Sequence, residues 1–349
     1  MTQDPGTSIA GDWVAQAAPV AERVAPTTLE GFLALVDEAR PVVMRGLIAH
    51  WPVVAAGRQG VGALADYLRR YDGGRPLGLM AGDPSIGGRF FYRDDFSGFN
   101  FERAQIPLPL LLEALVDAAQ QPVPPALYAG ASTAAEHFPG WTRDHVLPLP
   151  VGDAQARLWI GNGSRVSAHY DMASNIAAVA AGRRRVVLFP PEQAENLYVG
   201  PLDMTMAGQP TSMVDLEKPD SIRFPRFVHA QAAAQVAQLG PGDAIYIPAK
   251  WWHEIRAEGP LNLLVNYWWT RGTPDAPFAA LIHAILAVRD RPAAERAALR
   301  DWFDLYVFGE QAGRVADHLP TAARGILGPP SPERDERIRG FLRRILGAT

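Results

Sequence analysis

Short apolar runs separated by turn residues dominate the middle of the chain, from Leu127 onward. Runs of this length, bounded by Gly, Pro and Asn, are typical of β-strands. Closely spaced strands of this kind favour a sandwich or a barrel. The runs are Arg157–Gly161, Asn175–Ala180, Arg185–Phe189, Gln235–Leu239, Asp243–Ile247, His253–Ala257 and Leu261–Trp268.

The segment before the strands mixes helical and extended patterns. Thr27 and Glu30 stand at capping-box spacing and precede apolar residues at helical spacing, which predicts a helix that ends near Arg40. Pro41–Gly46 reads as a short buried strand, and Val61–Tyr71 as an amphipathic helix. We therefore expect an α+β N-terminal section.

The segment after the strands is helical. Apolar residues recur at three- and four-residue steps in Pro277–Val288 and in Ala293–Phe308, which predicts two amphipathic helices. The whole pattern predicts a mainly β protein with helices. Its expected parts are residues 1–125 as an α+β section packed on a barrel, 126–271 as the barrel, and 272–349 as a helical region.

Composition narrows the possible functions. Hydrophobic residues make up 48% and charged residues 20% of the 349 residues, a globular balance. The net charge of −4 and the lack of a long Lys/Arg run argue against general nucleic-acid or membrane binding. The absence of cysteine excludes disulfides, thiolate zinc sites and cysteine nucleophiles, and it suits a reducing compartment. Residues 1–18 lack the basic patch and apolar core of a signal peptide, so we expect a soluble, cytoplasmic protein.

Three residues are candidate metal ligands. His169 and Asp171 are separated by one residue, and side chains at this spacing on a strand share one face. A lone His-x-Asp is more often a surface pair, so the assignment depends on a third ligand. His253 follows the turn and apolar strand Gly240–Pro248, which can return it across a barrel. Two imidazoles and one carboxylate leave three coordination positions free, the arrangement of non-haem Fe(II) sites.

The other histidines, six of the eight, have no carboxylate at strand spacing in a comparable setting. We expect them at the surface or as capping residues, and His229 is kept as a residue that could lie near the site. Several aromatic residues flank the candidate ligands. Most of these should belong to the core, and a minority could wall a substrate entrance. They are Tyr170, Trp251, Trp252, Tyr267, Trp268 and Trp269.

Further motifs surround the ligands in a fixed order: Leu158–Gly161, His169–Asp171, Asn175, Gly182–Pro191, Gly240–Pro248, Trp251–His253 and Asn266–Trp268. Together they resemble the JmjC-type, cupin-like 2-oxoglutarate oxygenases, over residues 127–270. The similarity is greatest to the branch that contains the asparaginyl hydroxylase acting on hypoxia-inducible factor. Residues 42–51 resemble the N-terminal part of that branch.

The resemblance implies a double-stranded β-helix that uses Fe(II), 2-oxoglutarate and dioxygen. In such enzymes 2-oxoglutarate is decarboxylated to succinate while a C–H bond of the substrate is hydroxylated. His169, Asp171 and His253 match the iron ligands of the family. These three residues would therefore be both the metal ligands and the catalytic centre.

Four further positions match residues that hold 2-oxoglutarate in the family. Tyr128 matches a tyrosine that binds the distal carboxylate, and Asn175 and Asn266 match asparagines near the metal-chelating end. Arg184 stands where close relatives have a lysine as the counter-charge to the distal carboxylate. Arginine can make the same ion pair, in a pocket of different depth. A solvated basic strand start is the alternative interpretation of Arg184.

A second departure concerns a hydroxyl group. The family has a threonine that assists the distal carboxylate, whereas this chain has Val166, with Ser167 beside it. One hydrogen bond to the co-substrate is therefore expected to be lost.

Two functions remain open. The first is a 2-oxoglutarate-dependent hydroxylase acting on a protein side chain, with a modified tRNA base or a small molecule as other substrates, and with demethylation less favoured. The second is a non-catalytic, metal-binding cupin that serves as a binding or regulatory module, which the departures at Arg184 and Val166 would allow. In the hydroxylases that the chain resembles, C-terminal helices pair two protomers, so we also expect a homodimer.

Overall fold

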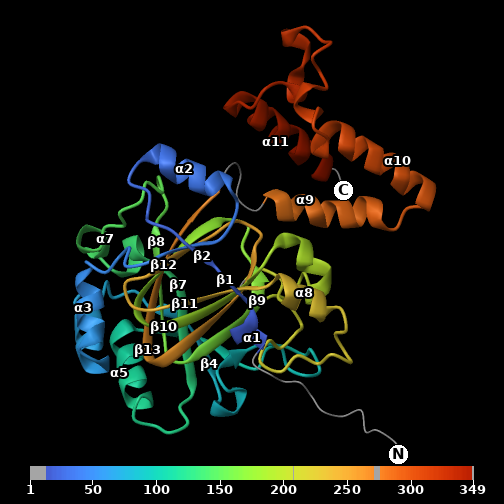
Figure 1. Cartoon of the computed structure of the whole chain (residues 1–349). Helices are drawn as coiled ribbons and strands as arrows, with labels where there is room; N and C mark the ends of the chain where they lie inside the picture. The colour runs from blue at the N-terminus through green and yellow to red at the C-terminus, as the bar shows by residue number, and fades with distance from the viewer. Residues whose placement is uncertain (1–12, 207, 271–275, 348–349) are drawn as a thin grey trace, which may run out of the picture. The chain divides into compact units, whose positions relative to one another are not determined.

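The structure is a computed structural model that describes residues 13–206, 208–270 and 276–347. The chain divides into two compact units, Met1–Pro274 and Asp275–Thr349 (Figure 1). No helix within the described ranges is long and apolar enough to cross a membrane. The cytoplasmic location stays a prediction from composition.

The first unit is built on two long antiparallel strands, β10 (Ser174–Phe189) and β13 (Trp252–Trp269). The other strands are β1 (Ala18–Pro19), β2 (Ala21–Glu22), β3 (Val42–Met44), β4 (Leu77–Gly82), β5 (Arg89–Phe90), β6 (Glu102–Ile106), β7 (Ala126–Thr133), β8 (Ala156–Gly161), β9 (Ser164–Tyr170), β11 (Gln235–Leu239) and β12 (Ala244–Ile247). The main path runs β2-β3-β12-β10-β13-β8-β7-β4-β6. The other halves of the long strands form the second layer. There, β11 pairs with β10 and β1 with β11, while β9 pairs with β13 and β5 with β9. This confirms the predicted double-stranded β-helix.

The number of strands differs from the prediction. Asn175–Ala180 and Arg185–Phe189, expected as two strands, are halves of β10, and His253–Ala257 and Leu261–Trp268 are halves of β13. The register between the two strands shifts around Ala181. Gly182 lies there at φ +74°, and a Cβ on it would approach the Asn262 side chain to 1.9 Å. A bulge at glycine bends a strand without ending it, which lets β10 pass from one layer to the other.

Helices of the N-terminal section cover the outer face of the main path. They are α2 (Leu29–Asp37), α3 (Pro52–Arg58), α4 (Val61–Arg69) and α5 (Leu108–Ala118), and Figure 1 shows α3 and α5 alongside the strands. Their buried residues share one hydrophobic core with Leu158 and Ile160 of β8. Since side chains alternate along a strand, Trp159 between them faces the opposite side, the barrel interior.

The first of these helices begins and ends differently from the prediction. Its N-cap is Thr28, whose hydroxyl accepts a hydrogen bond from the Gly31 amide at 3.1 Å, and not Thr27. It ends at Asp37, before Arg40, because Ala39 has a positive φ of 49°. The remaining helices of this unit are α1 (Trp13–Gln16), α6 (Ala134–His137), α7 (Trp141–Asp144) and α8 (Phe227–Ala233), with 3₁₀ turns at Pro84–Ile86 and Pro191–Leu197.

The second unit is helical, as predicted, and exposes much apolar surface. It comprises α9 (Ala276–Ala284) with a π-helical continuation Ile285–Arg289, α10 (Ala293–Phe303) with a continuation Asp304–Phe308, 3₁₀ turns at Ala312–Arg314, Thr321–Ala323 and Gly325–Leu327, and α11 (Pro332–Leu346). Leu286 is 82% exposed, Trp302 62% and Phe308 75%. Of the apolar residues described in this unit, only Ala316 is buried.

Candidate metal centre and its cavity

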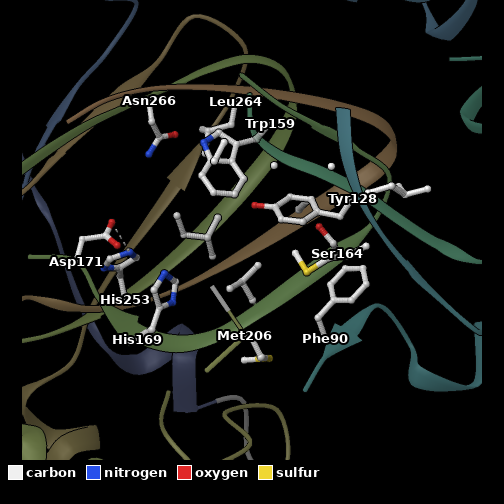
Figure 2. A pocket seen from close by; sticks show the side chains of 18 of the residues that line it. Phe90, Tyr128, Trp159, Ser164, His169, Asp171, Met206, His253, Leu264 and Asn266 are labelled. Carbon is white, nitrogen blue, oxygen red and sulfur yellow. Dashed lines mark ion pairs between the residues drawn. The ribbon is translucent and has the colours of Figure 1, made fainter. Parts of the chain in front are cut away.

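The three candidate ligands converge at the start of β13. His169 on β9 and His253 on β13 are directly opposite each other in the register, and Asp171 follows the end of β9. One ligand atom from each residue lies within 4.8 Å of the other two. Figure 2 shows the two imidazoles and the carboxylate turned toward one another. The gap is suitable for one divalent ion with bonds of about 2.0–2.2 Å.

Hydrogen bonds to the backbone orient both imidazoles. Nδ1 of His169 lies 2.9 Å from the Ser167 carbonyl oxygen, and Nδ1 of His253 lies 3.0 Å from the Trp251 carbonyl oxygen. Because a carbonyl oxygen can only accept, each Nδ1 carries the proton and each Nε2 keeps its lone pair. Nε2 of His253 is 3.8 Å from Oδ2 of Asp171. Each ring therefore offers Nε2 to the space between the three ligands.

The charge state of the centre suits a cation. His253 is only 2% exposed. Burial, with a further contribution from the neighbouring His169, holds the pKa of His253 below its ordinary value, so this ring is neutral at pH 7. A neutral imidazole is the form that binds metal. With the Asp171 carboxylate, the cluster presents the two-imidazole, one-carboxylate set of non-haem iron sites.

The three candidate metal ligands line a cavity of about 550 Å³ between the two layers of the barrel. This volume lies within the range of about 300–1,000 Å³ typical of small-molecule sites. Trp159 and Tyr128 stack with ring centroids 5.5 Å apart and form an apolar part of the wall. In Figure 2 the Tyr128 hydroxyl points toward the side of the cavity that holds the ligands.

The cavity floor is organised in rows across β9, β13 and β10. In the row nearest the metal, His169 lies opposite His253. In the next row, Val166 lies opposite Ile255 and gives an apolar belt. In the third row, Ser164 and Arg184 lie on either side of Ala257, so this row is polar at both ends. The residues of all three rows line the cavity.

Arg184 is the buried cation of the third row. Its residue is 2% exposed, and among the described residues its Nε and Nη1 have no hydrogen-bond partner. Burial lowers its pKa to about 10, so the guanidinium is still charged at pH 7. A buried charge without a partner is costly, and an anion bound in the cavity would remove that cost. The cavity therefore fits a ligand that combines a metal-binding end, a short apolar middle and a distal carboxylate, which is the chemistry of 2-oxoglutarate.

Three polar side chains complete the wall. Nδ2 of Asn266 donates to Oδ1 of Asn175 at 2.9 Å, and both residues are buried. Oδ1 of Asn266 has no partner in the described structure. Burial raises the pKa of Tyr128, against the opposing effect of the Arg184 charge, so its hydroxyl stays protonated and can donate. The seven residues singled out from the sequence all line this one cavity: Tyr128, His169, Asp171, Asn175, Arg184, His253 and Asn266.

Most of the aromatic residues that flank the site belong to the core, as expected: Trp251, Trp252 and Tyr267 are buried in the cores, while Trp268 lines the cavity. His229 is exposed on α8 and does not line the cavity. His145, expected at the surface or as a cap, is fully buried.

Several cavity residues were not predicted from the sequence. The largest are Phe90, Trp159 and Met206, which come from three separate parts of the chain. Ser164 was also missed, because counting back from His169 in steps of two leads to Ser167. One extra residue on β9, between Val166 and His169, shifts the register there and turns Ser167 away from the cavity.

The fold and the centre define a cupin-like protein with a His-Asp-His metal site. The cupin-like domain family matches residues 28–274, and the chain belongs to it.

Similar curated proteins include a lysine-specific demethylase, a Jumonji C domain-containing protein and a tRNA wybutosine-synthesizing protein. Lysine-specific demethylase 8 of Xenopus tropicalis is 30% identical over 240 residues, 66% of this chain and 48% of that protein. Jumonji C domain-containing protein 5 of Drosophila melanogaster is 33% identical over 119 residues, 34% and 28% of the two chains. The tRNA wybutosine-synthesizing protein 5 of Danio rerio is 35% identical over 107 residues, 31% and 30%. The chain spans about half, or less, of the length of these relatives.

These similarities confirm the predicted JmjC and cupin-like family. They do not single out the asparaginyl hydroxylase branch. Together with the His-Asp-His cluster, they also confirm the predicted cofactors, Fe(II), 2-oxoglutarate and dioxygen.

Proposed function

We propose that this protein is an Fe(II)- and 2-oxoglutarate-dependent oxygenase that hydroxylates a C–H bond of its substrate. The observation that carries the proposal is the position of Arg184. This buried cation, two of whose nitrogens have no hydrogen-bond partner among the described residues, lines the same cavity as three converged metal ligands, one apolar row away from them. A module that only bound metal would have no use for an unpaired charge at that place.

Each residue has a distinct task in this proposal. His169, Asp171 and His253 hold the iron, which, when bound with 2-oxoglutarate, supplies the activation of dioxygen. Arg184 and the Tyr128 hydroxyl bind the distal carboxylate. Asn175 and Asn266 provide a polar, hydrogen-bonded pair near the metal-binding end, and the apolar walls exclude water from the reacting centre. These walls include Trp159, Ile255 and Leu264.

We propose a protein side chain as the substrate. The similarity to proteins named as lysine-specific demethylases supports a polypeptide, and demethylation begins with the same hydroxylation step. The similarity to a tRNA wybutosine-synthesizing protein keeps a modified RNA base as the competing class. The net charge of −4 favours the polypeptide, because RNA binding is driven by positive charge.

Conversion of 2-oxoglutarate to succinate tests the proposed reaction. The full chain is incubated in air with Fe(II), 2-oxoglutarate and a protein extract as substrate pool, and succinate is followed by NMR. We expect succinate to accumulate with the native protein and not with Asp171→Ala. Binding of both metal and 2-oxoglutarate without any succinate would favour the non-catalytic module instead.

We also propose that the second unit forms a homodimer interface. Leu286, Trp302 and Phe308 are more than half exposed, at 82%, 62% and 75%. Apolar surface of this extent on a helical unit marks an interaction site, and a two-fold contact between identical copies is the commonest arrangement. Light scattering should give a dimer for the intact chain and a monomer after deletion of residues 272–349. A monomeric intact chain at micromolar concentration would refute the interface.

A further inference from the structure

We propose that Ser164 supplies the hydroxyl that binds the distal carboxylate of the co-substrate together with Arg184. This inference rests on the proposed function and adds a residue that determines co-substrate affinity. It reverses the expectation that the loss of a hydroxyl at Val166 leaves the carboxylate one hydrogen bond short.

The register places Ser164 and Arg184 in one row. Ser164 on β9 and Arg184 on β10 are both opposite Ala257 of β13. Residues opposite each other on neighbouring strands project to the same face. With strands about 4.8 Å apart, the two Cα atoms are about 10 Å apart across the row. The small Ala257 side chain leaves the space between them open to a planar anion.

Burial and direction support the same role. Ser164 is 5% and Arg184 is 2% exposed, and both line the cavity. Figure 2 shows the Ser164 hydroxyl directed toward the cavity. A carboxylate between them would receive donors from both ends of the row, from the guanidinium on one side and the hydroxyl on the other, in a region from which water is largely excluded.

Val166 cannot take this role, and neither can Ser167. Val166 has no polar atom, and it lies in the apolar row. Ser167 is fully buried, but its hydroxyl lies on the opposite face, where it accepts a hydrogen bond from Nε of Arg89 at 3.4 Å. Relative to the position of the family's threonine, which Val166 occupies here, the hydroxyl on the cavity side of β9 lies two residues earlier, at Ser164. It therefore lies in the same row as Arg184.

The experiment compares two ligands that differ only in the distal carboxylate. Binding of 2-oxoglutarate and of 2-oxopentanoate to the Mn(II)-loaded full chain is measured by isothermal titration calorimetry. The ratio of the two affinities isolates the distal carboxylate, because the metal-binding end is identical. Ser164→Ala should lower this ratio about tenfold, since a hydrogen bond to a charged group contributes about 1.5 kcal/mol or more.

Three further variants show whether a loss is due to the hydroxyl of Ser164. Ser164→Thr keeps the hydroxyl and should retain most of the ratio. Ser164→Cys keeps the volume with a weak donor and should lower the ratio like alanine, which gives a second test if the alanine variant does not fold. Ser167→Ala, a buried serine of the same strand on the other face, should leave the ratio unchanged.

Several outcomes would overturn the inference. An unchanged ratio in both Ser164→Ala and Ser164→Cys would remove Ser164 from the site while leaving the proposed function intact. An equal loss in Ser167→Ala would indicate a general effect on β9. Native protein that binds neither acid would contradict the proposed function itself, and this inference with it.

Discussion

Two regions of the first unit bury polar side chains in different ways. In the helical layer, His145 is fully buried with both ring nitrogens paired: Nδ1 with the Trp141 carbonyl oxygen and Nε2 with the Tyr67 hydroxyl, each at 3.0 Å. Oη of Tyr67 also lies 3.0 Å from Oη of Tyr71, and the Tyr71 hydroxyl donates to Asp144 at 2.9 Å. Both nitrogens of the His145 ring are thus paired within the protein, and these contacts link α4 to the end of α7.

In the cavity, equally buried groups lack such partners. His253 has its Nδ1 paired, but its Nε2 faces His169 and Asp171 across a gap. Within the described part of the chain, two nitrogens of Arg184 have no hydrogen-bond partner, whereas its neighbour Arg185 pairs with Glu217 on the other face of β10. Leaving a buried donor unpaired costs about 1–3 kcal/mol or more. A buried histidine with both nitrogens paired is therefore structural, whereas buried groups that converge without partners mark a ligand site.

The largest expected effect breaks the metal end of the cavity. His169→Ala or Asp171→Ala should abolish stoichiometric metal binding, because two remaining ligands cannot hold a labile divalent ion against water. Metal content after gel filtration measures this, with His229→Ala, an exposed histidine of α8, as the matched control. Full metal content in both ligand variants would rule out the assignment.

The next effect concerns the charge at the far end. Arg184→Ala should weaken 2-oxoglutarate binding by about 2–5 kcal/mol, because the distal carboxylate would be buried without its counter-charge. Arg184→Lys should lose less, since it keeps the charge. Arg183→Ala is the matched control on an exposed neighbour. If calorimetry gives the same affinity for Arg184→Ala as for the native chain, the counter-charge is another residue, and Arg103, the other arginine that lines the cavity, is next to be tested.

A smaller effect sharpens the other side of the comparison. Burial lowers the pKa of His145 to about 4, below the ordinary value of about 6.5. Between about pH 6.5 and about pH 4, the His145 ring is therefore protonated in the unfolded chain but not in the folded chain. Stability should fall with decreasing pH by up to about 1.4 kcal/mol per pH unit between the two values.

Urea denaturation at pH 7 and at pH 5 measures this contribution. The native protein should lose more stability between the two pH values than His145→Gln does, by up to about 2 kcal/mol. Equal losses in the two proteins would mean that His145 does not carry the effect. The variant should also be less stable at pH 7, because it leaves the Tyr67 network incomplete.

The sequence was sufficient for the features that follow regular periods. The convergence of the candidate metal ligands could be predicted because His169 and Asp171 keep strand spacing, and the strands could be predicted because their apolar runs are continuous. What it did not reveal depends on irregularities. The bend at Gly182 joins two expected strands into one, and the extra residue before His169 brings Ser164 and not Ser167 into the cavity.

Tertiary packing also decided which aromatic residues meet the cavity. Trp159 lies between Leu158 and Ile160, whose side chains belong to the core shared with α5. The Trp159 side chain therefore points the other way, into the cavity. Phe90 and Met206 belong to segments outside the main barrel strands, and only the folded chain brings them to the wall. Such contacts have no signal in a single sequence.

We propose that the three metal ligands and Arg184 form the two ends of one ligand site. Calorimetric titration of 2-oxoglutarate into the full chain, with and without Mn(II), tests this proposal. We expect one binding site per chain whose affinity rises strongly with Mn(II) and falls in Arg184→Ala. Binding of 2-oxoglutarate that is the same with and without the metal would contradict it.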